Sequence, residues 1–359
     1  MRDSLEISGR WESEGKRVAA ATLITVGGST PRRSGARLLV SSAGDSWGSV
    51  SFGCVEADVA AHAREVLGTR RPRLASYGMT DEDAFAVGFT CGGTLEVFIE
   101  PWTRLSERLG GAPGEAFVGA LATVVAGPEL GSHALFDRET GSATGDLSPV
   151  SARVLAADAA TVADAEQARV IQLNEARVFL EPVVPEPRLL IFGAGHTAQA
   201  LTAAASRVGF RVTVCDHRPA AAQPEHYPDA AQVLVGWPEQ LMPAVAPDSR
   251  TYVVVLAHNP EIEDMLLPLL LTSETRYVGV LGSRRTHAAR VQRLTAAGLS
   301  EEQIARLYAP VGLDIGAVTP EEIAASIVGE LISERRRQPS KTGDLLVGSG
   351  HGSLTVGSS

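Results

Sequence analysis

Two of the chain's three cysteines lie in glycine-flanked turns, where a sulfur atom could do chemistry. Cys54, in GCVE (53–56), follows a short apolar strand and precedes an amphipathic helix. Because the helix dipole favours negative charge at that end, the pKa of this thiol is expected below its ordinary value of about 8.5. Cys91 opens CGG (91–93), ahead of another strand. The sequence leaves open which thiol is functional, and inert packing of Cys54 beneath the helix is the alternative.

Charged side chains in the same region suit an anionic ligand. The motif GGSTPRRSGARLL (27–39) places Arg32, Arg33 and Arg37 beside glycines that expose backbone N–H groups. Guanidinium groups and such amides together bind phosphate and similar anions. A solvated basic loop is the alternative. Glu56 either accepts hydrogen bonds in the first helical turn or contacts a ligand, and no histidine stands at zinc-ligand spacing from the cysteines.

The clearest motif is LLIFGAGHTAQAL (189–201), which lies between a buried strand and a helix. Gly193, Gly195 and Ala198 form the pattern G-x-G-x-x-A, and His196 opens the helix. Small residues at these positions permit a tight turn, close approach of a pyrophosphate and close helix–strand packing. The motif predicts a nucleotide-binding turn, with a nucleotide-free domain of the same fold as the alternative.

An acidic residue accompanies this turn. Asp216 ends the strand RVTVCD (211–216), about 20 residues after Gly195, where a ribose-binding acid is expected. Its charge favours NAD over NADP, a preference that the neighbouring His217 and Arg218 soften.

Two further groups follow strands of the same region. Ser283, Arg284 and Arg285 come directly after the strand YVGVLG, at the start of a helix. Because positive charge is disfavoured at a helix N-terminus, either an anion binds there or the side chains extend into water. His258 follows another strand at the same carboxyl edge, where ligands of open α/β sheets bind. A satisfied loop histidine is the alternative.

The elements that position the cysteines and arginines are expected to form an α+β domain over residues 1–182. A helix is expected at 55–67, and strands are expected at 17–26, 36–42, 47–53 and 91–101. The stretch 102–180 is less legible and shows only a hairpin around GSATGD (141–146). The strand ARVFLEP (176–182) echoes LEVFIEP (95–101), so the two pair or play equivalent roles, and no longer internal repeat is evident.

The second half of the chain has a different pattern. After a proline-rich linker at 183–188, continuous apolar strands alternate with amphipathic helices over 189–337. This alternation predicts a parallel sheet covered by helices on both faces, a Rossmann-like domain. The last helix opens with a capping box from Thr319 to Glu322. The Gly/Ser-rich end, 338–359, predicts a flexible tail.

The composition narrows the class of protein. With 44% hydrophobic and 21% charged residues, the 359-residue chain resembles ordinary soluble globular proteins. A net charge of −10 argues against nucleic acid or an anionic membrane surface as a partner. The chain has neither a secretory signal nor an apolar run near the length of about 20 residues that spans a bilayer. Three widely spaced cysteines form no disulfide framework, so we expect a cytoplasmic protein.

Six ordered blocks between about residues 15 and 335 together resemble the XdhC/CoxI family. The blocks are ITVGGSTPRRSGARLLV, GCVEADV, CGGTLEVFIEP, IFGAGHTAQAL, VLGSRRTHAARVQRL and PVGLDIGAVTPEEIAASI. Members are accessory proteins of xanthine dehydrogenase, carbon monoxide dehydrogenase and related molybdenum hydroxylases. The resemblance implies an α/β protein with a C-terminal Rossmann-like parallel-sheet domain and a smaller N-terminal α+β XdhC/CoxI domain.

The resemblance also implies a role. Family members are thought to bind the molybdenum cofactor, protect it while it gains its terminal sulfur, and aid its insertion into the apo-hydroxylase. The cofactor is a phosphorylated pterin dithiolene, so its carrier needs an anion cradle and a soft contact near the metal. The expected cofactor-binding residues are Arg32, Arg33, Arg37, Gly53, Cys54, Glu56, Cys91, Gly92 and Gly93, with Cys54 as a candidate contact to molybdenum.

Partners and alternatives follow from the same resemblance. The apo-hydroxylase, a cysteine desulfurase-type sulfur donor and a second copy of the chain are the expected partners, and NAD(P) is a second candidate ligand. The expected nucleotide-binding residues are Gly193, Gly195, His196, Ala198, Asp216, His258, Ser283, Arg284 and Arg285. An NAD(P)-dependent oxidoreductase and a nucleotide-responsive sensor are the alternatives; the former lacks a convincing acid/base pair beside the nicotinamide position.

Overall fold

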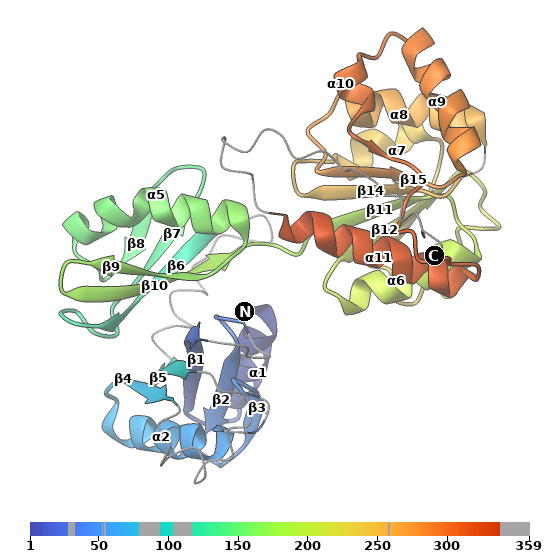
Figure 1. Cartoon of the computed structure of the whole chain (residues 1–359). Coiled ribbons are helices and arrows are strands. Elements are labelled where there is room, and N and C mark those ends of the chain that lie inside the picture. The colour runs from blue at the N-terminus through green and yellow to red at the C-terminus, as the bar shows by residue number, and fades with distance from the viewer. Residues whose placement is uncertain are drawn as a thin grey trace, which may run out of the picture. The chain divides into compact units, whose positions relative to one another are not determined.

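The chain folds into two compact units, Met1–Pro185 (unit 1) and Glu186–Ser359 (unit 2) (Figure 1). The computed structural model describes residues 1–27, 33–51, 53, 55–78, 94–102, 117–257 and 259–337. None of the helices in these ranges has the length and apolar character needed to cross a membrane.

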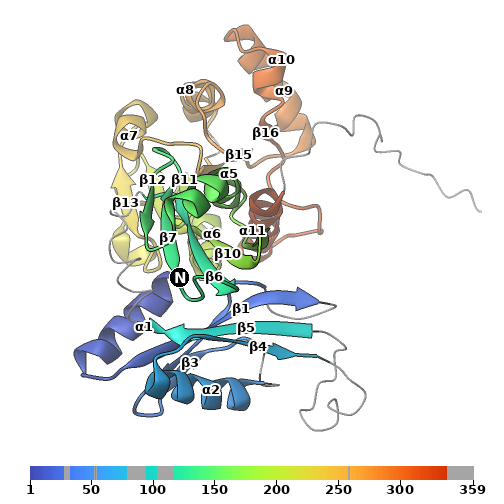
Figure 2. The ribbon, with the colours of Figure 1, turned by 90° about the vertical axis from the view of Figure 1, so that its left-hand side faces the viewer.

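Unit 1 begins with helix α1 (Arg2–Ser13) and a five-stranded antiparallel sheet of order β3-β2-β1-β5-β4. Its strands are β1 (Val18–Gly27), β2 (Arg37–Ser41), β3 (Ser46–Gly48), β4 (Arg73–Tyr77) and β5 (Thr94–Pro101). Side chains alternate between the faces of a strand, so Ala19, Ala21 and Leu23 of β1 point to one side. There they pack under helix α2 (Glu56–Thr69), which covers the outer face of this first sheet (Figure 2).

The second sheet of unit 1 repeats this arrangement in the order β8-β7-β6-β10-β9. Its elements are β6 (Gly119–Ala126), β7 (His133–Asp137), β8 (Ala143–Gly145), α5 (Pro149–Ala165), β9 (Arg169–Leu173) and β10 (Ala176–Val183). Both sheets follow the chain order of three strands, one helix and two strands. The echoed motifs are β5 and β10, which hold the same place in the two sheets. The equivalent roles are therefore confirmed, whereas the expectation that no longer repeat exists is wrong.

The strand registers support the equivalence residue by residue. Thr22 on β1 lies opposite Arg37 on β2, and Thr123 on β6 lies opposite His133 on β7. Each threonine also pairs with a phenylalanine on its other side, Phe98 on β5 or Phe179 on β10. The two sheets are thus copies of one topology with different side chains.

A glycine is required at the same point of both copies. A Cβ on Gly48, whose φ is +86°, would lie 2.2 Å from the carbonyl oxygen of Arg37. A Cβ on Gly145 would lie 2.1 Å from the carbonyl oxygen of His133. The third strand of each copy can approach its neighbour this closely only without a side chain.

The faces that the helices leave uncovered pack against each other. Ile24 and Phe98 of the first sheet share a buried cluster with Val125 and Phe179 of the second. The outer face of the second sheet packs on α5. Unit 1 is therefore a four-layer structure of helix, sheet, sheet and helix.

Two buried ion pairs cross the interface between the sheets in opposite directions. Arg37 on β2 pairs with Glu181 on β10, and both side chains are almost fully buried. His133 on β7 lies with Nε2 2.9 Å from Oε2 of Glu100 on β5, again in the interior. Each copy therefore supplies a cation to the carboxylate of the other.

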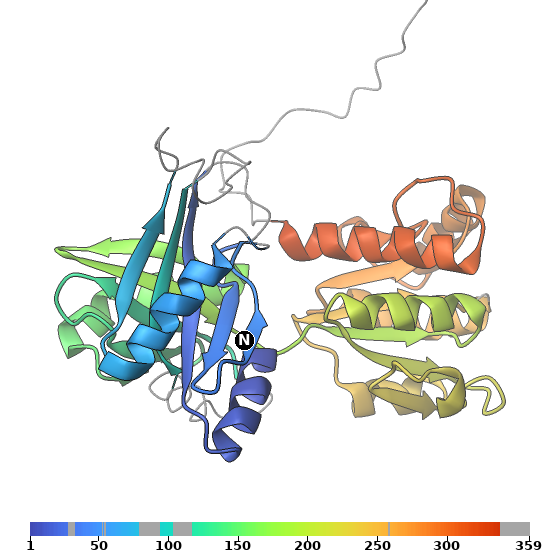
Figure 3. The same cartoon turned by 90° about the horizontal axis from the view of Figure 1, so that it is seen from below.

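Unit 2 holds a six-stranded parallel sheet of order β13-β12-β11-β14-β15-β16. Its strands are β11 (Arg188–Phe192), β12 (Arg211–Asp216), β13 (Gln232–Val235), β14 (Thr251–Val255), β15 (Tyr277–Val280) and β16 (Leu307–Tyr308). Helices α6 (His196–Arg207) and α11 (Pro320–Arg336) lie side by side on one face (Figure 3). The other face packs on α7 (Pro238–Val245), α8 (Pro260–Leu271), α9 (Arg284–Ala296) and α10 (Glu301–Ile304), and a 3₁₀ helix spans Pro224–His226.

Most expected elements are confirmed, with some differences. The alternation expected after residue 189 forms the Rossmann-like sheet, and α11 opens with the Thr319–Glu322 capping box. The strand expected at 47–53 stops at Gly48, and the region 102–180 also contains β6, α5 and β9, which the sequence pattern did not reveal.

Removing one member of a buried pair tests the interface. Arg37→Met removes the cation in direct contact with the buried Glu181 carboxylate, so we expect the free energy of unfolding to fall by roughly 3–5 kcal/mol. Arg138→Met is the control, because it breaks an exposed pair with Asp164 and should cost at most about 1 kcal/mol. Denaturant titration followed by tryptophan fluorescence measures both variants, and equal losses would contradict the assignment.

The His133–Glu100 pair predicts a pH dependence. Burial disfavours the imidazolium, but the Glu100 carboxylate outweighs it and raises the pKa of His133. A raised folded-state pKa contributes stability below the unfolded value of about 6.5 and loses it as pH rises through the folded pKa. Glu100→Gln removes the main attraction for the imidazolium, so the stability that the parent protein loses as pH rises through the pKa of His133 should be smaller or absent in the variant. Melting temperatures from pH 6 to 9 test this; parallel profiles for the two proteins would rule it out.

Candidate functional site

The predicted cofactor residues belong to segments that leave the first sheet at one end. Gly27, the last residue of β1, pairs in register with Thr94, the first residue of β5. The carbonyl of Arg37, the first residue of β2, accepts a hydrogen bond of 2.9 Å from the N–H of Ser49, directly after β3. The end of β1, the start of β2, the end of β3 and the start of β5 therefore lie at the same end of the sheet.

The connection between β4 and β5 starts at this end as well. Tyr77, the last residue of β4, donates a hydrogen bond of 2.7 Å from its hydroxyl to Oδ2 of Asp58 in the first turn of α2. The described residues that flank segments 28–36, 49–55 and 78–93 thus lie at one end of the first sheet, called the loop end below.

The predicted residues at the loop end fall into two groups. Those outside the described residues are Arg32, Cys54, Cys91, Gly92 and Gly93. Among the described ones, Arg33 and Gly53 are exposed. No group of histidine, cysteine or acidic side chains in the described ranges is arranged to hold a metal ion.

Arg37 takes a different place from the one expected. It was predicted to share in an anion cradle, but its side chain points between the two sheets, is 7% exposed and pairs with Glu181. Its guanidinium is already committed to a buried carboxylate, and a ligand at the loop end would have to break that pair to reach it. Among the described residues, Arg33 is the member of the predicted cradle that stays accessible.

Glu56 organises the turn that carries position 54. Its carboxylate accepts hydrogen bonds from the Ser49 hydroxyl at 2.7 Å, the Ser51 hydroxyl at 2.6 Å, the Ser51 N–H at 2.8 Å and the Gly53 N–H at 2.7 Å. Burial opposes ionisation, but these donors lower the pKa of Glu56 to about 2. All of these donors precede α2, so Glu56 fixes the turn before the helix rather than capping the first helical turn, and the two serines are partners that the sequence pattern did not single out.

The second sheet has no comparable chemistry at its equivalent end. Its connections are 127–132, 146–148 and 174–175, which contain neither cysteine nor arginine. They carry acidic residues instead, among them Glu129 and Asp146. Thiols and guanidiniums are thus found at the loop end of one copy only.

The G-x-G-x-x-A turn of unit 2 has the local geometry that its residues predict. Gly193, with φ +111°, follows β11, and a Cβ there would lie 2.5 Å from the backbone nitrogen of Ala257. Ala198 is buried where α6 packs on the sheet. Helix α6 starts at His196 after Gly195 and has no acidic side chain in its first turn. Its first N–H groups can therefore receive an anion such as a pyrophosphate.

Asp216 lies at the end of β12 and is fully engaged inside the protein. Its Oδ2 accepts hydrogen bonds from the Ala194 N–H at 2.6 Å and Arg218 Nη2 at 2.8 Å. Its Oδ1 accepts from the Arg218 N–H at 2.8 Å and Arg218 Nε at 3.0 Å. Burial raises the pKa of Asp216, but these donors outweigh burial and lower it, so the side chain is ionised.

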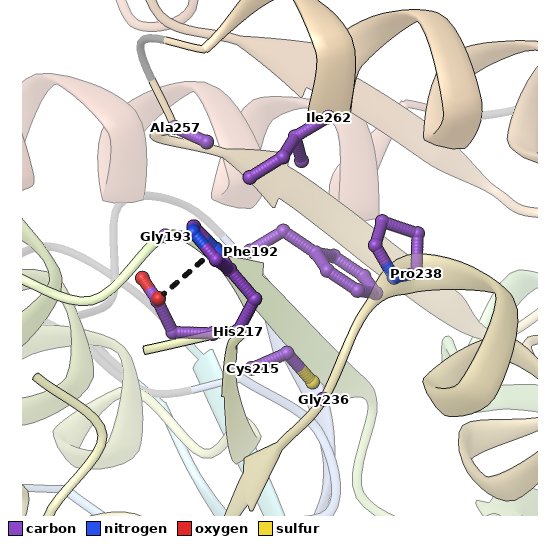
Figure 4. Close-up of a pocket in the computed structure, with 9 residues that line it drawn as sticks. Phe192, Gly193, Cys215, His217, Gly236, Pro238, Ala257 and Ile262 are labelled. Atoms are coloured by element: carbon purple, nitrogen blue, oxygen red, sulfur yellow. Dashed lines mark ion pairs between the residues drawn. The ribbon is translucent and has the colours of Figure 1, made fainter. Parts of the chain in front are cut away.

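A pocket lies beside Asp216 at the carboxyl ends of β11 to β14 (Figure 4). It is lined by Phe192, Gly193, Cys215, Asp216, His217, Gly236, Pro238, Ala257 and Ile262. Burial raises the pKa of the Cys215 thiol to about 12, so this sulfur is an apolar part of the wall. The lining is mainly apolar, but the cavity volume is only about 10 Å³, which is far smaller than that of a small-molecule site.

Ser283, Arg284 and Arg285, also predicted to bind the nucleotide, do not line this pocket. Ser283 caps α9 by accepting a hydrogen bond from the Thr286 N–H. Arg284 is exposed and lies 3.8 Å from the exposed Asp314, and Arg285 is also exposed. Their placement matches side chains extending into water. His258 lies outside the described residues.

A change at Glu56 tests its role in the turn. Glu56→Gln removes the charge that four donors share, and charge-assisted hydrogen bonds contribute about 1.5–3 kcal/mol each. We expect unit 1 to lose roughly 2 kcal/mol of stability at pH 7, with a smaller difference from the parent near pH 2. Glu65→Gln, on the exposed side of α2, is the control. Denaturant titration at both pH values measures the free energy of unfolding of the two variants. Equal losses of stability in Glu56→Gln and Glu65→Gln would refute the assignment.

Comparison with known proteins places the chain in a family. The family model for the XdhC Rossmann domain matches residues 189–331, and the model for the XdhC and CoxI family matches residues 11–78. A protein of Bacillus subtilis, named as a probable subunit of xanthine dehydrogenase, is 31% identical over 319 residues, covering 88% of this chain and 93% of that protein. The molybdenum cofactor insertion chaperone PaoD of Escherichia coli is 29% identical, covering 90% and 85%.

A solved structure agrees with these matches. A crystal structure described as a xanthine dehydrogenase from Bacillus halodurans superposes with a TM-score of 0.76 at 28% identity, covering 94% of this chain and 97% of that one. The matches in sequence and structure extend over both units. The chain belongs to the XdhC and CoxI family.

Proposed function

We propose that this protein is an accessory factor that binds the molybdenum cofactor at the loop end of unit 1. It delivers the cofactor to an apo-hydroxylase of the xanthine dehydrogenase type. The observation that carries the proposal is that the described residues flanking segments 28–36, 49–55 and 78–93 lie at one end of the first sheet. The name of the relative from Escherichia coli, a molybdenum cofactor insertion chaperone, points to the same role.

The chemistry of the cargo fits the residue types of these segments. The cofactor carries a phosphate, which Arg32 and Arg33 can neutralise with charge-assisted hydrogen bonds. Its dithiolene-bound molybdenum is a soft centre, to which a thiolate of Cys54 or Cys91 is a matching ligand. Glu56 holds Ser51 and Gly53, which precede position 54 in the chain, through their N–H groups.

One chain should hold one cofactor. The equivalent end of the second sheet has no arginine to neutralise a phosphate and no thiol to bind molybdenum. The family model for XdhC and CoxI also matches residues 11–78, which lie in the first copy. The second copy then serves as the scaffold that covers the inner face of the first.

The role implies further partners. We include a cysteine desulfurase-type sulfur donor, because the cofactor gains its terminal sulfur before insertion, and a second copy of this chain. A reduced, cytoplasmic setting suits the free thiol of Cys215 and the proposed thiolate at position 54 or 91.

Molybdenum content tests the proposal. The full chain, purified after co-expression with the cofactor pathway, should contain a pterin and at most about one molybdenum per chain by metal analysis and mass spectrometry. Replacing the ligating cysteine, in Cys54→Ser or Cys91→Ser, should reduce retention by roughly tenfold or more. Cys215→Ser is the matched control, because that thiol is buried in unit 2.

Three results would count against the proposal. They are a parent protein without molybdenum, full retention in both Cys54→Ser and Cys91→Ser, and equal loss in Cys215→Ser.

A further inference from the structure

The pocket of unit 2 is separate from the proposed cofactor site and has its own chemistry. The strand order of the sheet reverses direction at β11, since β12 lies on one side of β11 and β14 on the other. Ligands of open parallel sheets bind outside the carboxyl ends of the strands at such a point. The pocket lies there, between Phe192, His217, Pro238 and Ile262, with the N-terminus of α6 beside it.

Asp216 has no acceptor position left for a ribose. An ionised carboxylate offers about four lone-pair positions. The Ala194 N–H takes one, and Arg218 takes three through its backbone N–H, Nε and Nη2. The two ribose hydroxyls of NAD need an acid at the end of this strand as their acceptor. They could bind Asp216 only by displacing Arg218.

Arg218 is held in place on the ligand side of this acid. Its Nη2 also donates to the Ala194 carbonyl at 3.0 Å, so the guanidinium bridges the end of β12 and the G-x-G turn. Asp216 is 2% exposed at its side chain, whereas Arg218 is 56% exposed. The carboxylate is hidden, and the group offered to a ligand at the ribose position is a cation.

We propose that unit 2 binds a 2′-phosphorylated adenine nucleotide of the NADP type, and that Arg218 sets the preference for it over the unphosphorylated nucleotide. A 2′-phosphate accepts the hydrogen bonds that a guanidinium donates and carries the opposite charge. The first N–H groups of α6 receive the 5′-phosphates. This assignment reverses the preference for NAD that the charge of Asp216 alone suggests.

Two nucleotides that differ only in the 2′-phosphate test the proposal. Calorimetry of the full chain should show that adenosine 2′,5′-bisphosphate binds roughly tenfold or more tightly than adenosine 5′-monophosphate, because one charge-assisted contact contributes about 1.5–3 kcal/mol. In Arg218→Met the bisphosphate should bind at least about tenfold more weakly. The monophosphate should bind more tightly, since two positions on Asp216 become free. Arg218→Lys keeps the positive charge but lacks the paired N–H donors of the guanidinium, so its preference for the bisphosphate should be intermediate.

A matched control removes an arginine from the C-terminal end of helix α6, away from the G-x-G turn. Arg207→Met, in the last turn of α6, should keep the affinities and the preference of the parent protein. Equal affinity of the parent for both nucleotides, binding of neither, or an unchanged preference in both Arg218→Met and Arg218→Lys would overturn the proposal. If Arg218→Met does not fold, as judged by circular dichroism, the Arg218→Lys variant decides.

Discussion

Two buried carboxylates, Glu100 and Glu181, determine how unit 1 is assembled. Placing an ionised carboxylate in an interior costs several kcal/mol unless a cation is supplied there. Neither sheet supplies one to its own carboxylate in these pairs; Arg37 and His133 come from the opposite sheet. A register shift of one residue would turn each charged side chain to the other face of its strand. The pairs therefore specify the sheet pairing, while the apolar cluster around Phe98 and Phe179 stabilises it.

The same constraint reaches the candidate site. Arg37 is the first residue of β2, so the pair with Glu181 anchors the strand at the root of the segment that carries the exposed Arg33. Its carbonyl also receives the Ser49 N–H, which starts the turn fixed by Glu56. The buried Arg37–Glu181 pair thus also fixes the position of the first residue after segment 28–36 at the loop end.

The sequence predicted best what depends on neighbours along the chain. The G-x-G-x-x-A turn, the alternation of unit 2 and the Thr319–Glu322 capping box are local patterns, and all appear in the structure. The repeat in unit 1 was visible only as the echo of LEVFIEP in ARVFLEP. Its equivalent positions share burial and pairing but differ in type, as Arg37 and His133 do. A repeat preserved as topology leaves little trace in residue identities.

Two charged residues that were predicted to bind ligands, Arg37 and Asp216, show why the site could not be predicted fully from the sequence. A sequence shows that a charge exists but not which partner satisfies it. The partner of Arg37 is 144 positions away on a strand of the other sheet. The partner of Asp216 is two positions away, but only the turn of the chain after β12 brings the Arg218 guanidinium back onto the carboxylate. Both charges were expected to meet a ligand, and both are paired within the protein.

The reciprocal pairs of unit 1 have the form of an isologous interface, the kind that holds twofold-symmetric dimers together. In a dimer of identical chains each site exists twice, and dilution separates the partners. Here both halves belong to one polypeptide, so the association is intramolecular and independent of concentration. The halves are also free to diverge, and one has thiols and arginines at its connections in addition to acids, where the other has neither thiol nor arginine. A partner protein therefore meets two ends that are equivalent in topology but differ in side chains. Only one of them, the loop end of the first sheet, has cysteines and arginines in its connections.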